Sequence, residues 1–241
     1  MHKILLIFLF SPNVDTYINS ISYAYENIGI EAVKLIHVKG TETGITDSEA
    51  SSLSSNIWSK IRDLSLNFSG VYKQINEKLL NRELISVDYS NLKQELRQIT
   101  KVQRNIKYIV DLTSAPKRPS IDIFAVCLAL GINSIYTFEL KLKYDSSNPE
   151  KFLYHALDQK DYSYTCLSET GPVKNSQSSL LRKAYLLWYV GVISLVIMLI
   201  SLIVFVTIGP ESHFIQGVNL TAAIVGLISP AFALVDQKRR A

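Results

Sequence analysis

The fold is decided near the N-terminus by the sequence KILLIFLF, which runs from Lys3 to Phe10. An uninterrupted apolar run of this kind is typical of a central parallel strand that is covered on both faces. Residues 13–28 then carry apolar side chains at helical spacing, and Gly29 is a stop signal for that helix. The segment from Glu31 to Val38 predicts a second strand. Strand, helix and strand in this order favour a right-handed crossover unit.

The same alternation continues to residue 168. We expect further strands at 83–87, 105–112, 133–140 and 161–168, and helices at 57–80, 89–100 and 119–131. Residues 41–55 are polar and rich in serine, which predicts a loop running into the next helix, and Gly70 is a candidate interruption of that helix. The sequence therefore predicts an α/β domain over residues 1–168, with three layers and a mostly parallel sheet, Rossmann-like in the broad sense.

The last quarter of the chain is much more apolar. Residues 184–208 and 214–235 contain no charged side chain and no histidine, and a helix of the first run would reach about 37 Å, enough to cross a hydrocarbon core of roughly 30 Å. We expect two transmembrane helices within residues 182–241, joined by the turn 209–213 and preceded by a linker at 169–181. Two very apolar core helices in a soluble protein are the alternative interpretation.

The flanking charges predict the orientation of this hairpin. Arg182 and Lys183 precede the first run, three basic residues at 238–240 follow the second, and the connecting turn has no lysine or arginine. By the positive-inside rule both outer ends face the cytosol. We therefore expect a multi-pass protein of the cell inner membrane whose α/β domain is cytoplasmic.

The composition limits the classes of function. The chain has 241 residues and a formal net charge of only +4, so no broad basic surface indicates binding of a DNA or RNA duplex. Cys127 and Cys166 lack metal-ligand spacing, which favours reduced cysteines in a cytosolic core. The sequence has no dinucleotide-binding glycine motif after the first strand, no P-loop and no catalytic histidine motif. We expect no metal, no cofactor and no catalytic residue, and binding is favoured over catalysis.

Two loops follow predicted strands where ligands bind in an open parallel sheet, beyond the carboxyl ends of strands at the point of chain reversal. The first loop is Ser11-Pro12-Asn13, and the second runs from Asp111 to Arg118. The second loop leads to a helix that we expect to begin at Pro119, and its hydroxyls, its two cations and the free amides of that helix suit a phosphate. Asp111 would accept a hydrogen bond from a ribose hydroxyl or a base. Ordinary turn residues and solvated charges are the simpler interpretation of each residue taken alone.

The segment YIVDLTSAPK, from Tyr108 to Lys117, combines a hydrophobic strand, Asp-x-Thr, a short turn and a lysine before an apolar helix. In this it resembles the fourth-strand loop of the sensor domains called CARF (CRISPR-associated Rossmann fold). The end of the first strand, Phe10 to Asn13, is similar to the other ligand loop of that family. The resemblance covers roughly residues 1–168. Ser114, Ala115 and Pro116 stand where the family has glycine or small turn residues, and Pro116 removes one backbone donor.

The resemblance implies binding of a cyclic oligonucleotide, a cyclic oligoadenylate in that family, across the two-fold axis of a homodimer. It also implies that a fused effector, here the two transmembrane helices, responds by permeabilising or depolarising the membrane in antiviral defence. Carried over position by position, the ligand-binding residues are Ser11, Asn13, Thr113, Ser114 and Lys117, with Arg118 as a further candidate. The alternatives are a membrane-tethered ring nuclease that cleaves the same ligand without a metal, and a passive membrane-anchored partner subunit that binds no nucleotide.

The helix expected after Pro119 is apolar nearly all round, so it must be covered on two sides. One side can face the sheet. The other side can face a second copy of the domain, which would bring two ligand loops together, or it can be buried within the same subunit. We favour a homodimer or a higher homo-oligomer.

Overall fold

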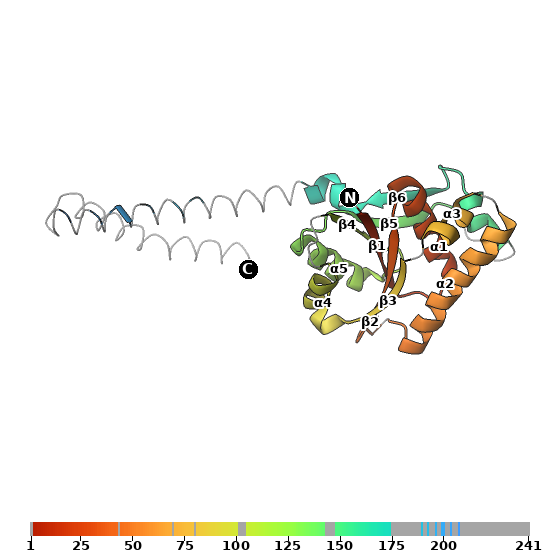
Figure 1. The fold of residues 1–241 in the computed structure, drawn as a ribbon, viewed down its shortest axis with the longest axis horizontal. Coiled ribbons are helices and arrows are strands. Elements are labelled where there is room, and N and C mark those ends of the chain that lie inside the picture. Colours follow the sequence, from red (N-terminus) through yellow and green to blue (C-terminus); the bar gives the residue numbers. More distant parts are fainter. Residues whose placement is uncertain are drawn as a thin grey trace. The chain divides into compact units, whose positions relative to one another are not determined.

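The computed structural model describes residues 2–42, 44–68, 70–79, 81–100, 105–142 and 148–174, together with seven single positions between 189 and 207. Strands and helices alternate from the N-terminus (Figure 1). The strands are β1 (His2–Leu9), β2 (Ala32–Lys39), β3 (Asn81–Asp88), β4 (Ile106–Asp111), β5 (Ile135–Leu140) and β6 (Tyr162–Cys166). The α-helices are α1 (Val14–Tyr23), α2 (Asp47–Asn67), α3 (Val71–Lys78), α4 (Leu92–Ile99) and α5 (Lys117–Ala129). The short helices are η1 (Ala24–Ile28), η2 (Tyr89–Asn91), η3 (Pro149–Phe152), η4 (Tyr154–Ala156) and η5 (Leu167–Glu169).

The six strands form one sheet in the order β3-β2-β1-β4-β5-β6. All neighbouring strands are parallel except β5 and β6, which are antiparallel. The chain moves from β1 outward to β3 and then returns to the other side of β1 as β4. The order of the strands therefore reverses between β1 and β4, and the predicted Rossmann-like α/β fold with a mostly parallel sheet is confirmed.

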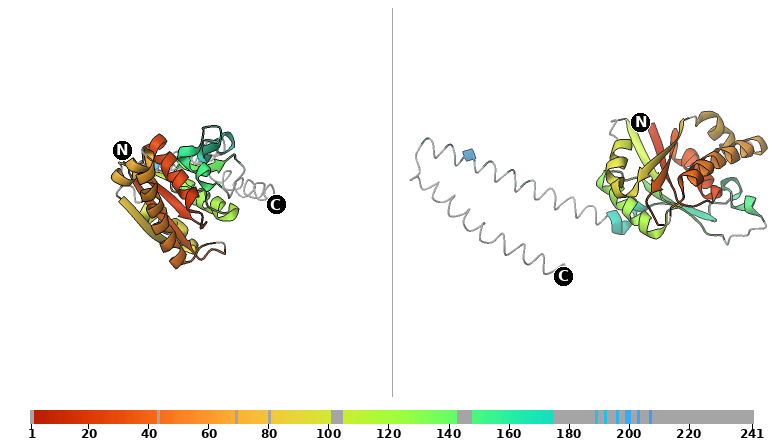
Figure 2. Two further views of the ribbon diagram at one scale, coloured as in Figure 1. Left: turned by 90° about the vertical axis from the view of Figure 1, so that its right-hand side faces the viewer. Right: turned by 90° about the horizontal axis from the view of Figure 1, so that it is seen from below.

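The sheet is covered on both faces. Helices α1, α2 and α3 lie on one face, and α4 and α5 lie on the other (Figures 1 and 2). Alternate residues of β1 contribute to the two cores: Leu5 and Ile7 pack with the first group of helices, whereas Leu6 and Phe8 pack with the second group. The unbroken apolar sequence of β1 is thus explained by burial on both sides.

Two helix boundaries differ from the sequence prediction. Helix α2 begins at Asp47, inside the serine-rich segment that predicted a loop, because Thr46 and Glu49 form a capping box. Helix α5 begins at Lys117, so Pro119 is the third residue of the first turn instead of the first. The interruption at Gly70 is confirmed: α2 ends at Asn67 and α3 begins at Val71, and Gly70 between them has a positive φ of 122°, which is incompatible with a continuous helix.

The chain divides into two compact units, residues 1–174 and residues 175–241. The predicted spans 184–208 and 214–235 lie outside the described residues apart from the seven single positions, which are helical. Within the part of the chain that the structure describes, none of the helices has the length and apolar character needed to span a bilayer.

Candidate functional site

The two predicted ligand loops lie side by side at the carboxyl ends of β1 and β4. Ile7 of β1 pairs with Asp111 at the end of β4. The hydroxyl of Ser114 donates a hydrogen bond of 2.6 Å to the carbonyl oxygen of Phe8. This bond joins the second loop to β1, the strand that leads into the first loop. The sheet topology therefore brings residues that are about a hundred positions apart in sequence into one site at the chain reversal.

Tyr17 of α1 holds the first loop in place by hydrogen bonds to its backbone. Its buried hydroxyl accepts hydrogen bonds from the backbone N–H groups of Phe10 and Ser11, at 3.2 and 3.0 Å, and donates to the carbonyl oxygen of Ser11 at 2.7 Å. Burial raises the pKa of Tyr17, so the phenol remains a neutral donor. Asn13 is the N-cap of α1, and its side-chain oxygen accepts a hydrogen bond from the backbone N–H of Asp15 at 3.1 Å.

Asp111, which the sequence suggests as an acceptor for a ribose hydroxyl or a base, is buried within the domain. Its side chain is buried, and its two oxygens accept hydrogen bonds from the hydroxyl of Tyr164 at 2.7 Å and from the backbone N–H of Thr113 at 3.0 Å. Burial raises the pKa of the Asp111 carboxyl, and these hydrogen bonds oppose that effect. The residue ties β4 to β6 and shapes the start of the second loop.

The hydroxyl of Thr113 is also engaged within the domain. It accepts a hydrogen bond from the backbone N–H of Phe138 at 2.7 Å and one from the hydroxyl of Ser20 at 3.3 Å. These contacts link the second loop to β5 and to α1. Thr113 and Ser114 are therefore half-buried residues whose hydroxyls hold the loop in place.

The two cations of the second loop point to solvent. Lys117 and Arg118 form the exposed start of α5, which has no side-chain cap after Pro116. No ion pair joins either cation to a carboxylate among the described residues. An uncapped helix start beside two free cations attracts an anion. Of the predicted residues, Asn13, Lys117 and Arg118 are exposed and Ser11 is half-buried.

Two shallow hollows flank these loops. One, of about 170 Å³, is lined by Pro12 and by the first half of α2, including Glu49, and has no cation in its lining. The other, of about 200 Å³, lies between Arg118 and the loop after β2, where Glu42 lines it. The positive charge of the site is therefore on the α5 side.

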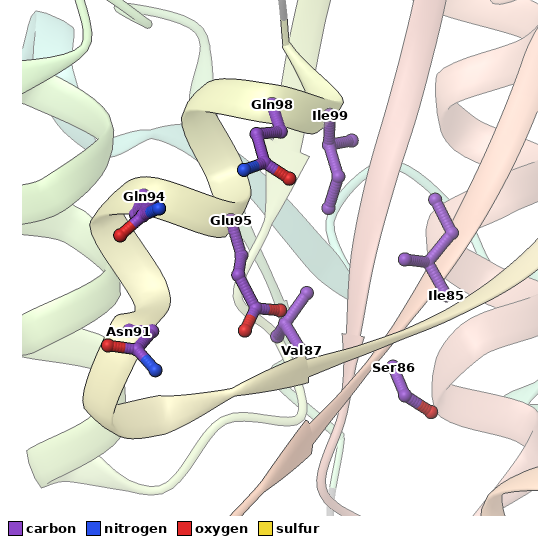
Figure 3. Close-up of a pocket in the computed structure, with 8 residues that line it drawn as sticks. All are labelled: Ile85, Ser86, Val87, Asn91, Gln94, Glu95, Gln98 and Ile99. Carbon is purple, nitrogen blue, oxygen red and sulfur yellow. The ribbon is translucent and has the colours of Figure 1, made fainter.

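A larger hollow, of about 380 Å³, lies at one edge of the sheet, between the edge strand β3 and α4 (Figure 3). Amide side chains at positions 91, 94 and 98 and the carboxylate of Glu95 face aliphatic residues of β3. Its lining holds no lysine and no arginine, and it contains none of the predicted site residues. An anion has no counter-charge there.

The histidine and cysteine residues lie outside the two loops. The described residues hold no cluster of histidine, cysteine and carboxylate side chains that is suited to a metal ion. His37 is buried, and one ring nitrogen lies 2.7 Å from the carbonyl oxygen of Ile45. Cys127 and Cys166 are free thiols, and burial raises the pKa of Cys127 to about 12. The arrangement can bind and orient an anion by hydrogen bonds and charge.

Sequence reasoning missed three residues that build the site. Tyr17, Ser20 and Tyr164 each donate a hydroxyl hydrogen bond to one of the two loops or to Asp111. Tyr17 and Ser20 lie in α1 and Tyr164 lies in β6, outside the two loops to which the sequence argument was confined. Only the pairing of β6 with β5 brings Tyr164 to the end of β4.

Comparison with known proteins finds similarity among solved structures. No family model matches the chain, and no curated protein matches it. Among solved structures, it is similar to Enterococcus italicus Csm6 bound to cyclic hexa-2'-fluoro-hexa-dAMP, with 13% sequence identity and a TM-score of 0.46. The similarity covers 76% of this chain and 44% of that chain. The chain thus corresponds to less than half the length of that protein, and a similarity of this size does not establish a shared function.

Proposed function

We propose that this protein is a sensor that binds a cyclic oligonucleotide, specifically a cyclic oligoadenylate, at the carboxyl ends of β1 and β4. Binding would switch apolar C-terminal segments that lie in the inner membrane, and the resulting leak or loss of membrane potential would serve antiviral defence. The observation that carries the proposal is the position of the two loops. They meet at the chain reversal of the sheet, with two unpaired cations at the uncapped start of α5.

The contacts of the site divide its residues into two roles. Lys117 and Arg118, with the first amides of α5, would bind phosphate groups, and Ser11 and Asn13 would contact a sugar or a base. Thr113 and Ser114 would act by positioning the loop, because their hydroxyls already bond to β5, α1 and β1. Asp111 would also act by positioning, because its carboxyl group accepts the backbone N–H of Thr113 at the start of the second loop.

A second copy of the domain is part of this proposal. Ile121 of α5 is 59% exposed, and Ala125, one turn further, is also exposed. An apolar face of this kind on a helix that begins at the ligand site is suited to a two-fold contact. Two such sites facing each other would encircle a ring-shaped anion with four cations.

The membrane part rests on the sequence of residues 182–241. The two charge-free runs have the length of membrane spans, and basic residues flank only their outer ends. The described positions Val192, Val196, Leu199 and Ile203 are helical and have 40–62% of their surface exposed. Apolar side chains of this kind favour a lipid environment.

The test is a liposome assay with the full-length protein. Vesicles that contain the protein and a potential-sensitive dye are titrated with cyclic tetra-adenylate and cyclic hexa-adenylate, and binding to the same preparation is measured by calorimetry. We expect saturable binding and ligand-dependent depolarisation, both lost in Lys117→Ala/Arg118→Ala. Binding without depolarisation would contradict the membrane part, and absence of binding would contradict the whole proposal. Linear products in the mixture, analysed by chromatography, would instead indicate a ring nuclease.

A further inference from the structure

A hollow that shares no residue with the two nucleotide loops is lined mainly by aromatic rings. It has a volume of about 290 Å³, close to the lower end of the range for small-molecule sites, about 300–1,000 Å³. Four separate segments of the chain build it. Glu26 comes from η1, Phe68 and Tyr72 come from the end of α2 and from α3, Tyr154 and His155 come from η4, and Tyr162 comes from β6.

The rings that line the hollow contact one another. Tyr154 and Tyr162 pack edge to face, with ring centroids 5.8 Å apart, and Tyr72 packs edge to face against His155 at 5.4 Å. Phe68 lies against His155 at 4.1 Å. The face of an aromatic ring carries a negative potential, so several faces around one hollow attract a cation.

The hollow has one formal charge, and it is negative. Glu26 is the only acidic residue in the lining, which holds no lysine and no arginine. The hydroxyl of Tyr154 donates a hydrogen bond of 2.6 Å to Oε2 of Glu26, and the side-chain amide of Asn27 donates to that hydroxyl at 3.0 Å. These two bonds hold the carboxylate at the hollow and leave its Oε1 for a ligand.

His155 contributes a neutral ring. The hydroxyl of Tyr72 accepts the backbone N–H of His155 at 3.4 Å, and the same oxygen lies 3.0 Å from Nδ1 of the imidazole. Partial burial lowers the pKa of His155 below its ordinary value, and burial raises the pKa of Tyr72 to about 12. At neutral pH the imidazole therefore does not repel a cation.

We propose that this hollow binds a small organic cation of the quaternary ammonium class, with its methyl groups against the rings and its charge balanced by Glu26. The geometry joins the two elements that such ligands need, a cage of aromatic faces and a single fixed carboxylate. The hollow shares no residue with the loops after β1 and β4, so this binding site is independent of the proposed nucleotide site.

The test compares choline with its uncharged isostere 3,3-dimethyl-1-butanol. The purified full-length chain is held in a maltoside detergent, which carries no ammonium group, and binding of each probe is measured by saturation-transfer NMR. We expect choline to bind about tenfold more tightly than the isostere, because only choline gains the cation–π and carboxylate interactions. Equal binding of the two probes, or no transfer to choline, would overturn the proposal.

Variants locate the site. Glu26→Gln should weaken choline binding about fivefold and leave the isostere unchanged, and Phe68→Leu should weaken choline binding because one ring is lost. The matched control is Glu31→Gln, since Glu31 is also exposed and its hydrogen-bond partner is His2, outside the hollow. If Glu31→Gln weakened choline binding as much as Glu26→Gln, non-specific attraction to the negative charge of the protein would explain the binding, and the proposed site would be contradicted.

Discussion

Ser114 and Phe8 join the loop after β4 to strand β1 through a hydrogen bond of 2.6 Å between the Ser114 hydroxyl and the Phe8 carbonyl oxygen. The bond crosses from the loop after β4 to the end of β1. It holds the second loop against β1 in the absence of a ligand, and a loop fixed in this way would lower the entropic cost of the proposed binding.

Removal of that hydroxyl should destabilise the domain. Ser114→Ala leaves the Phe8 carbonyl without this donor, and we expect the free energy of unfolding to fall by about 1 kcal/mol. Urea denaturation followed by circular dichroism measures the change. Ser55→Ala is the control, because Ser55 is exposed on α2 and bonds only to the preceding turn at Ser51. A loss of the same size in both variants would argue against a special role for Ser114.

The charge at the start of α5 should decide nucleotide affinity. Lys117→Ala should weaken binding of cyclic oligoadenylate at least about tenfold, because a charge-assisted hydrogen bond to phosphate is lost. Isothermal titration calorimetry at two salt concentrations measures both the loss and the smaller salt dependence that should accompany it. Lys107→Ala, at an exposed position of β4, should bind as the wild type does. Unchanged affinity in Lys117→Ala would move the anion site elsewhere.

Asp111 should make stability depend on pH in a direction opposite to that of a surface carboxylate. Its folded-state pKa lies above the unfolded value, so between those two values the native state binds more protons. Stability from this group is therefore present below the unfolded pKa of about 3.9 and is lost as the pH rises through the folded pKa.

The variant Asp111→Asn isolates this effect. Exposed carboxylates with lowered pKa values, such as Asp47 and Asp88, contribute stability that increases as the pH rises, and they cancel when the two proteins are compared. We expect the stability of the wild type to decline with rising pH relative to the variant, in urea titrations from acid to neutral pH. Parallel curves for the two proteins would contradict a buried, titrating Asp111.

The C-terminal segments should retain the protein in membranes. After cell lysis, the full-length chain should resist extraction by alkaline carbonate, because two charge-free segments of this length partition into lipid. A chain that ends at residue 174 should be released into the supernatant. Release of the full-length chain by carbonate would show that its attachment is peripheral or absent.

The fold was largely predictable because buried strands appear in the sequence as continuous apolar runs and helices appear as apolar residues at helical spacing. The apolar run of β1 and the helix stop at Gly29 gave the first crossover, and the structure has both. The start of α2 was missed although Thr46 and Glu49 form a recognisable capping box, since the serine content of that segment favoured a loop. Composition was the weaker signal there.

The position of the two loops in the fold was predictable, but the contacts of each side chain were not. Strand order and loop chemistry located the loops after β1 and β4. The sequence could not distinguish a hydroxyl that faces solvent from one that faces inward, as Thr113 and Ser114 show. Whether Asp111 is exposed depends on Tyr164, which is 53 positions away, and that contact exists only in the folded sheet.

The reversed direction of β6 has a mechanical consequence. Tyr162 pairs with Leu140 and Cys166 pairs with Tyr136, so the last strand travels from the edge of the sheet that bears the loops to the edge opposite. Its five residues cover roughly 17 Å. Under the proposed function, a cyclic ligand bound at the loop edge would therefore affect the chain that leaves the opposite edge by reorienting the whole domain relative to its dimer partner. The rigidity of the sheet would then determine how strongly ligand binding changes the position of that chain.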